Sequence, residues 1–236
     1  MKRRSDTFLA AKAAFPYTLP LLAGFLFLSI AYSILMRSMG FAPWYPIVMS
    51  IFIFAGAMQF VALNLLTAAF APIGVLVLTL MVNARHIFYG LSMLDVYRNT
   101  GKKKWYLIFA LCDETFSINC TVPVPEEIDR GKFYFFVTLF NYSYWQVGTI
   151  LGALFGQFFT FDTQGIEFMM TALFLVIFVN QLMREKNHIS SCMGLVISIL
   201  CLIFFGKDQF ILASMAGLLL LLTLMRRPIE REEAYP

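Results

Sequence analysis

The sequence has 236 residues, of which 60% are hydrophobic, 17% aromatic and only 14% charged. Soluble globular domains carry roughly 25% charged residues, and a water-exposed surface built from fewer would hold large apolar patches. The composition therefore excludes an ordinary soluble protein and indicates a polytopic integral membrane protein. The formal net charge of +4 comes from small basic clusters at the ends of hydrophobic runs, which is typical of cytoplasmic loops and does not indicate nucleic-acid binding.

Hydrophobic segments follow one another along the chain, separated by Gly, Pro and short polar runs. A spanning helix needs about 20 apolar residues, so the length allows seven or eight. The expected segments are 15–37, 43–67, 72–94, 104–122, 133–159, 166–184, 189–206 and 208–226. The sequence therefore predicts an all-α fold, a transmembrane helical bundle in a single integral membrane domain over residues 1–236. The basic N-terminus precedes a run too long for a signal peptide, so this run is the first span.

The basic clusters constrain how these segments cross the bilayer. They lie at the N-terminus and at residues 98–104, 184–188 and 226–231, and the positive-inside rule favours the cytoplasmic side for all of them. Three full spans between the N-terminus and Lys102 would place the second cluster outside. Either one early segment is re-entrant or broken, or this loop is an exception to the rule.

Two pairs of polar residues recur at similar places. Asn83 in LTLMVNARH and Asn180 in LVIFVNQLM each follow, by one helix, a glutamine, Gln59 and Gln146 respectively. This is consistent with an inverted repeat of two three-helix units, 15–94 and 104–184, followed by a C-terminal hairpin over 189–226, as in many secondary transporters. The alternative is chance similarity between apolar helices.

Ionisable residues within apolar segments are the first candidates for function, because one at mid-helix costs at least about 2.5 kcal/mol on insertion scales. The third segment contains Asn83, Arg85 and His86, and the fourth contains Asp113 and Glu114. We expect Arg85 to pair with Asp113 or with Glu114. The alternative is that the two carboxylates lie at the membrane boundary, where charge costs little.

Amide side chains form a second group of candidates. Gln59 and Asn64 follow small residues in the second segment, which suits a broken helix whose freed backbone groups hold a zwitterionic solute. Asn141 and Gln146 lie on neighbouring faces of the fifth segment, next to glycines at 148, 152 and 156 whose spacing predicts close packing on another helix. The alternative role for these amides is hydrogen bonding between helices. The candidate site residues are Gln59, Asn64, Asn83, Arg85, His86, Asp113, Glu114, Asn141, Gln146 and Asn180.

Enzyme motifs are missing from the sequence. It contains no Walker A, dinucleotide-binding, metalloprotease, EF-hand or nucleophile-elbow pattern, only two histidines and no CxxC pair. We therefore expect no enzyme activity, no cofactor and no metal site, and any transport would draw on ion gradients or be passive.

Three runs carry a resemblance to a known family. They are the small-residue stretch before Gln59-Phe60, the run VNARHIFY from Val82 to Tyr89, and Asp113-Glu114. In this order and spacing they resemble the AzlC family, which includes YgaZ-type proteins, over roughly residues 15–225.

This resemblance implies a multi-pass bacterial inner-membrane protein that exports Leu, Ile and Val, and also Met, together with a small membrane protein of the AzlD type. It also makes Asp113 and Glu114 candidates for the substrate ammonium or a coupling proton, and Gln59 and Asn83 candidates for the substrate carboxylate. The alternatives are a transporter or channel for another small solute or ion, and a structural membrane subunit whose polar residues only join helices.

Overall fold

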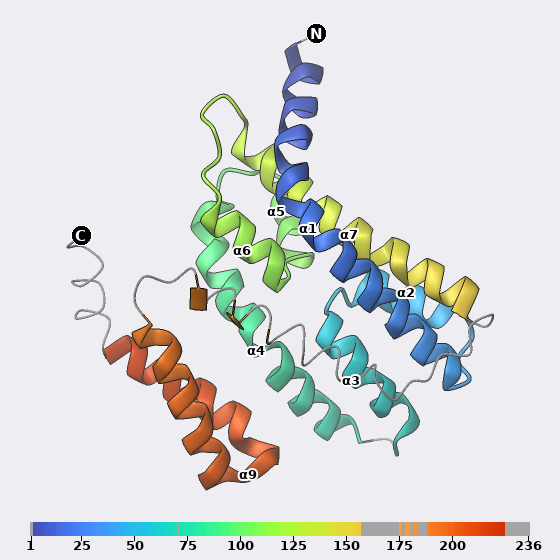
Figure 1. The fold of residues 1–236 in the computed structure, drawn as a ribbon, viewed down its shortest axis with the longest axis vertical. Helices are drawn as coiled ribbons and strands as arrows, with labels where there is room; N and C mark the ends of the chain where they lie inside the picture. Colours follow the sequence, from blue (N-terminus) through green and yellow to red (C-terminus); the bar gives the residue numbers. More distant parts are fainter. Residues whose placement is uncertain are drawn as a thin grey trace. The chain divides into compact units, whose positions relative to one another are not determined.

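The computed structural model describes residues 2–69, 71–156, 175, 178–179, 182–183 and 188–224. These residues form helices and connecting turns and include no strand (Figure 1), as the sequence predicts. Contacts divide the chain into two compact units, Met1–Met170 and Thr171–Pro236. Each unit is described by itself below.

The first unit contains three long helices and two pairs of short ones. In chain order they are α1 (Lys2–Ser38), α2 (Trp44–Phe52), α3 (Gly56–Thr67), α4 (Pro72–Val96), α5 (Lys103–Phe109), α6 (Asp113–Thr121) and α7 (Arg130–Phe155). The predicted second segment is thus broken at residues 53–55, as its small residues suggested. The fourth segment, predicted as one span over 104–122, is also broken, at residues 110–112.

Helices α1 and α7 pack side by side and run in the same direction. Phe25 meets Trp145 edge to face at 6.0 Å, and further along both helices the Ser33 hydroxyl donates to the Thr149 carbonyl oxygen at 2.9 Å. The glycine-rich face of α7 allows this approach: a Cβ atom added at Gly152 would lie 2.6 Å from the backbone oxygen of Ile30. The predicted close helix packing is confirmed, and α1 is the partner.

Helices α2 and α3 form a hairpin that starts and finishes near the C-terminal end of α1. The chain reverses direction between the two helices, and their facing ends are in contact: the Gln59 amide of α3 donates to the Ser50 hydroxyl of α2 at 2.9 Å. Leu63, further along α3, then packs with Met36 near the end of α1. This pair is therefore re-entrant: it approaches the middle of the unit and returns to the side from which it came (Figure 1).

Helices α5 and α6 form a second hairpin, which enters from the opposite end. Along α5, Lys103 lies over the ring of Phe135 near the start of α7, and Phe109 reaches Tyr142 halfway along it. Helix α6 returns, so that Asn119 donates to the Tyr97 hydroxyl at the end of α4 at 2.8 Å. Each hairpin follows a long helix, and the two hairpins point in opposite directions.

Helix α4 connects the two ends of the unit. It follows α3, and at its far end Met93 and Tyr97 share a buried apolar core with Ala14 of α1 and Phe133 of α7. The order of long helix and re-entrant hairpin, α1 with α2–α3 and α4 with α5–α6, therefore occurs twice with opposite direction. The predicted repeat, with units 15–94 and 104–184, stays a prediction because its second unit extends into residues outside those described.

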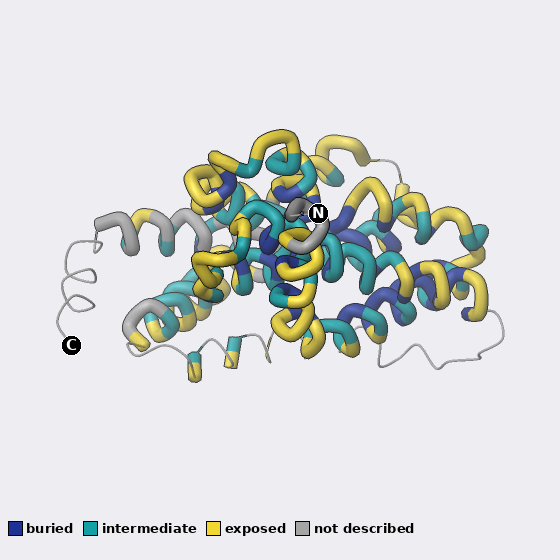
Figure 2. The backbone as a smooth tube through the Cα atoms, turned by 90° about the horizontal axis from the view of Figure 1, so that it is seen from above, coloured by how far each residue is buried: buried dark blue, intermediate teal, exposed yellow. Residues whose placement is uncertain are grey.

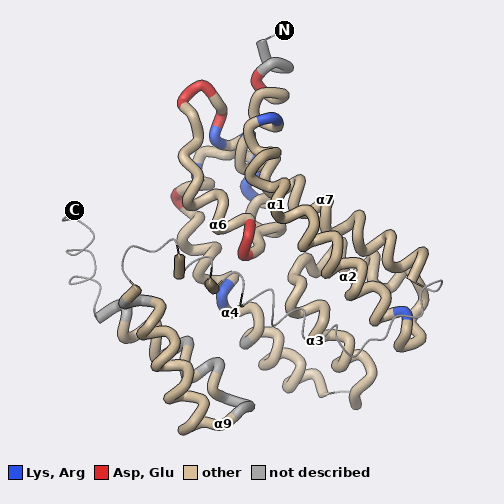
Figure 3. The backbone as a smooth tube through the Cα atoms, in the orientation of Figure 1, with Lys and Arg blue, Asp and Glu red and all other residues tan. Residues whose placement is uncertain are grey.

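Most charged residues of this unit lie at one end (Figure 3), whereas Arg37, in the last turn of α1, lies at the other. We call the former the charged end: it holds the start of α1 and residues 95–104 and 122–132. No charged residue occurs from position 38 to position 84, which covers the turns at the opposite end. The re-entrant α2–α3 hairpin thus places the N-terminal basic cluster and the cluster at 98–104 on the same side, as the positive-inside rule favours.

Exposed residues line the outer faces of the described helices (Figure 2), and many of them are large and apolar. Exposed side chains include Phe27, Ile73 and Leu91, as expected of a surface that faces lipid. By length and composition, one described helix (Asp6–Ser38) could cross a membrane, and α4, bent by 45° near residue 81, makes a second if it counts as one span. The predicted number of seven or eight segments is not confirmed, since both breaks leave only short helices.

The second unit is an apolar helical hairpin. Its helix α9 (Ile189–Leu224) contains one non-helical residue, Gly206, with φ at 70°. A Cβ atom added at Gly217 would lie 3.5 Å from the Ile197 side chain, so the second half folds back on the first. Residues 189–224 thus fold back at Gly206, while the predicted C-terminal hairpin over 189–226 stays a prediction as a division of the chain. Most of the predicted segment 166–184 lies outside the described residues.

A substitution on the glycine face of α7 tests the α1–α7 packing. We expect Gly152→Ala to lower the thermal midpoint of the purified protein, because the new Cβ meets backbone atoms of Ile30 that cannot yield, and overpacking costs about 1–3 kcal/mol. Gly24→Ala on α1 is the control, since nothing lies within 4 Å of its added Cβ. Equal midpoints for the two variants would contradict the described packing.

Cysteine labelling tests the re-entrant hairpins. In a background without the native cysteines, single cysteines would replace Met39, Ala69, Asn99 and Glu127. We expect the first two to react from one side of the membrane and the last two from the other, because each pair flanks one hairpin. If residues 44–67 instead crossed the bilayer fully, the cysteines at positions 39 and 69 would react from opposite sides.

Candidate functional site

The tips of both hairpins meet at the middle of α7, around Tyr142. Its hydroxyl donates to the Ile51 carbonyl oxygen near the end of α2 at 3.1 Å, and its ring lies 4.9 Å from that of Phe54 in the first break. On its other side, the rings of Tyr106 and Phe109 in α5 lie at 6.0 and 6.5 Å. One aromatic side chain therefore contacts both hairpins.

The break after α2 frees carbonyl groups that α7 then bonds. The last carbonyls of a helix have no partner within it, and here the Gln146 amide donates to the Ser50 carbonyl oxygen at 2.8 Å. The Ser50 hydroxyl lies 2.9 Å from the Thr149 hydroxyl and accepts from Gln59. Ser50 is thus the centre of a buried polar cluster that joins α2, α3 and α7.

Several buried polar atoms in this region have no hydrogen-bond partner. They include Oε1 of Gln59, Oδ1 of Asn141, Oε1 of Gln146 and Nε1 of Trp145, and the side chains of Gln59 and Asn141 are fully buried. Turning an amide over would exchange a bare oxygen for a bare nitrogen, so one polar atom stays unpaired either way. Each such atom costs about 1–3 kcal/mol, which is the pattern expected where a ligand supplies the missing bonds.

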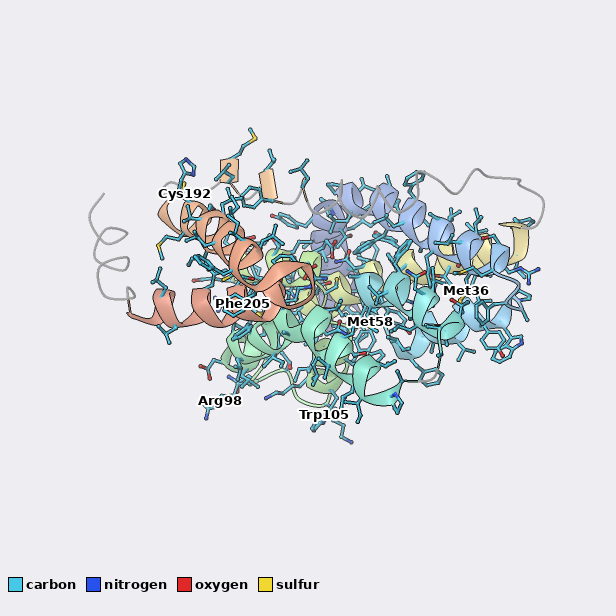
Figure 4. All side chains as sticks on the ribbon, turned by 90° about the horizontal axis from the view of Figure 1, so that it is seen from below. Met36, Met58, Arg98, Trp105, Cys192 and Phe205 are labelled. Atoms are coloured by element: carbon cyan, nitrogen blue, oxygen red, sulfur yellow. The ribbon has the colours of Figure 1, made fainter. Side chains whose placement is uncertain are left out.

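Two helices begin inside the unit at these breaks. Neither α3 at Gly56 nor α6 at Asp113 has a side-chain cap from its N-cap residue. At α3 the first backbone N–H groups remain available to an anion, whereas at α6 the carboxylate of Glu114 accepts from its own backbone N–H. Met58, in the first turn of α3, is buried in the interior, whereas Arg98 and Trp105 project outward at the edge of the view (Figure 4). The ring of Trp145 covers Gly56 so closely that an added Cβ would lie 2.9 Å from it.

The charged residues of the middle region come from α4 and α6. Arg85 Nη1 lies 3.2 Å from Asp113 Oδ2, which is one of the two pairs expected from the sequence. Neighbouring helix residues diverge by about 100°, so Glu114 faces a different direction. Tyr89 stacks on Phe116 at 4.4 Å and holds α4 against α6.

Asn141 ties the first turn of α6 to α7. Its amide nitrogen donates to the Thr115 hydroxyl at 3.0 Å, next to Glu114 in sequence, while its oxygen stays bare. The polar cluster at Ser50 and the carboxylates of α6 therefore lie along one stretch of α7, from Asn141 to Thr149.

Not every predicted residue joins this region. Asn64 is exposed on α3, and the Asn83 amide donates to Thr79 of its own helix at 3.1 Å. His86 is half-buried on α4, with its ring against Tyr89 at 5.8 Å. Asn180 lies outside the described residues.

Residues that the prediction omitted also belong to the region. They are Ser50, Thr115, Tyr142, Trp145 and Thr149, which make the contacts described above. Hydroxyl and aromatic residues are common in membrane helices, so their type alone gave no signal. The aromatic-rich run at 141–146 was the only local sign.

Comparison with known proteins gives a consistent result. A family model described as "AzlC protein" matches residues 20–159, a range that includes both hairpins and α7. The branched-chain amino acid transport protein AzlC of Bacillus subtilis (strain 168) is 56% identical over 99% of this chain and 92% of its own length. An uncharacterized membrane protein of Haemophilus influenzae is 47% identical over 94% of this chain and 91% of its own.

A more distant relative is the inner membrane protein YgaZ of Escherichia coli, 28% identical over 72% of each chain. No solved structure matches this chain. The relatives carry the names of membrane proteins, in agreement with the composition and the apolar helix surfaces. The chain is therefore a membrane protein that belongs to the AzlC family.

Proposed function

We propose that this chain is a secondary transporter that exports branched-chain amino acids from the cytoplasm, coupled to protons and working with a small AzlD-type membrane subunit. The observation that carries this proposal is the meeting of two re-entrant hairpins at α7, where helix N-termini lie beside bare amide oxygens and carboxylates. The name of the Bacillus subtilis relative, a branched-chain amino acid transport protein, supports the substrate class. The small subunit is proposed on the ground of the family.

The chemistry of the region suits an aliphatic amino acid. Its carboxylate would accept hydrogen bonds from a helix N-terminus, and its ammonium would donate to amide oxygens and a carboxylate. The rings of Phe54, Phe109 and Tyr142 would cover an apolar side chain. One or two methyl groups are worth only about 1–3 kcal/mol in such a site, so Leu, Ile, Val and Met should overlap as substrates.

The charge distribution supports an orientation of the chain in the membrane. The positive-inside rule assigns the charged end to the cytoplasm, so α5–α6 would enter from the cytoplasm and α2–α3 from the outer side. Substrate would reach the carboxylates of α6 from the cytoplasm and leave along the α2–α3 hairpin. Breaks halfway through the unit suit alternating access, since each hairpin covers the central region from one side only.

A flux experiment tests this proposal. Cells without their own exporters would be loaded with a leucine-containing dipeptide, and intracellular leucine, isoleucine, valine and methionine would be followed over time. We expect lower intracellular leucine in cells that express this chain with its small partner than in cells with an empty vector. No difference, despite verified membrane expression of both chains, would refute the proposal and favour a transporter or channel for another solute.

Replacement of Gln59 separates a binding role from helix joining. We expect Gln59→Leu to abolish export, yet to leave the thermal midpoint of the purified protein close to that of the wild type. The lost Gln59–Ser50 hydrogen bond is worth about 0.5–1.5 kcal/mol, and its loss is offset because a bare buried oxygen that costs about 1–3 kcal/mol is removed as well. The Ser50 hydroxyl keeps its bond with Thr149. The control is Asn64→Leu, on the exposed face of α3, which should retain export. A large fall in the midpoint of Gln59→Leu would instead identify Gln59 as a structural link between helices.

A further inference from the structure

We propose that Glu114 is a shared carboxylate, which binds the ammonium group of the amino acid and the coupling proton in turn. This inference rests on the proposed function and deepens it. In this proposal the substrate and the proton bind to the same side chain at different times, and there are no separate sites for the two. Three features of the described residues carry it: a charge imbalance, a fixed ion pair and a bare acceptor.

The middle of the first unit holds more carboxylates than cations. Between positions 13 and 36, 38 and 94, 105 and 125, and 133 and 156, the Lys, Arg, Asp and Glu residues are Arg85, Asp113 and Glu114 alone. With both carboxylates ionised, this region carries one uncompensated negative charge. A bare charge in the bilayer interior is costly, so one carboxylate needs a proton or a bound cation.

The ion pair assigns this role to Glu114. Asp113 already faces the Arg85 guanidinium at 3.2 Å. Glu114 has no salt bridge within the described part of the chain, and the charged groups around it are Asp113 on its own helix and Arg85 on α4. Along the described part of α7, no charged residue follows Lys132. The carboxylate of Glu114 accepts hydrogen bonds from its own backbone N–H and from Cys112, but it is the carboxylate of this region without a salt bridge in the described part of the chain.

His86 is the other titratable side chain that could balance the charge. Its charged neighbours are Asp113 and Arg85, and its ring lies against Tyr89. A positive charge on His86 would lie beside Asp113, which is already paired with Arg85. It would therefore not serve as the cation for Glu114. The other neighbours of Glu114, Cys112 and Thr115, are uncharged.

The bare oxygen of Asn141 distinguishes an ammonium group from a proton alone. A proton on Glu114 makes one bond, whereas an ammonium group offers three N–H donors and needs further acceptors. Asn141 is fully buried, its nitrogen is bonded to Thr115 beside Glu114, and its Oδ1 has no partner. In the proposed site, this oxygen on α7 would supply a second acceptor for an ammonium group bound by Glu114, the residue that precedes Thr115 in α6.

The exchange then follows from competition for one carboxylate. When the ionised Glu114 binds the ammonium of a zwitterion, Glu114 gains a cationic partner, and the carboxylate of the zwitterion needs donors of its own, such as the N-terminus of α3; when a proton binds Glu114, the ammonium loses its partner and leaves. One proton replaces one amino acid, and no covalent bond to carbon changes. In the empty, ionised state Glu114 has neither a proton nor an ammonium group as partner, and an unpartnered carboxylate is costly in the interior, so we expect only the loaded and the protonated states to change access.

Proton release on substrate binding tests the shared site. The full chain with its small partner would be purified, and leucine added in weakly buffered solution with a pH-sensitive dye. We expect up to one proton released per leucine bound by the wild type, and an affinity for leucine that falls by up to about tenfold per pH unit on the acidic side. 4-Methylpentanoate, which lacks the ammonium group, should not compete with leucine.

Variants separate the possible roles in proteoliposomes. We expect E114Q to lose both leucine–leucine exchange and pH-driven leucine transport, Glu114→Asp to retain proton-linked binding at lower affinity, and Glu126→Gln at the charged end to resemble the wild type. If E114Q kept the exchange and lost only the pH-driven transport, Glu114 would carry the proton alone and the shared site would be refuted. Proton release that survived in E114Q but vanished in His86→Asn would also overturn the proposal.

The same assays distinguish failure of the inference from failure of the proposed function. A wild-type complex that neither binds nor exchanges leucine would refute the proposed function itself. A wild-type complex that exchanges leucine without releasing protons, and an E114Q variant that behaves identically, would refute only the shared carboxylate. Unchanged elution and thermal midpoint of E114Q would exclude misfolding as the cause of any loss.

Discussion

Peptide groups inside a bilayer have no water to bond with, so every break in a helix must be compensated by protein. The breaks at residues 53–55 and 110–112 create this requirement twice, and α7 meets it at the first break with side chains. Gln146 and Tyr142 bond the freed carbonyls of Ser50 and Ile51, and Asn141 holds the start of α6 through Thr115. The hairpins can enter the interior only because α7 presents these groups at its middle.

The helix that carries these groups is itself held firmly. Its glycine face lets α1 approach to backbone contact at Gly152, and the Ser33–Thr149 hydrogen bond joins the two helices at that level. Such packing resists separation, whereas each hairpin is held to α7 by a few polar bonds and ring contacts. The unit thus combines a rigid helix pair with two lightly attached hairpins, which is the division of roles that alternating access needs.

Sequence reasoning reached the broken second segment, the glycine packing face and the Arg85 ion pair, because each has a local signal in residue type and spacing. It missed the break at 110–112, since Ala-Leu-Cys contains no glycine or proline to interrupt an apolar run. It could not tell that Asn64 faces outward or that Asn83 bonds its own helix, because the inward face of an apolar helix depends on its neighbours. The spacing of the glycines in α7 predicts a close contact with another helix, but it does not identify that helix as α1.

The opposed hairpins have an electrical consequence. A helix that spans the bilayer insulates over its full thickness of about 30 Å, but each hairpin covers only about half of it, and the two halves meet at the ring of Tyr142. The membrane potential, worth about 2.3 kcal/mol per elementary charge per 100 mV, would then fall mainly across this short layer. A charged side chain that moved a few ångströms beside Tyr142 would cross most of the potential difference. Such a local movement would therefore be measurable as a transmembrane current.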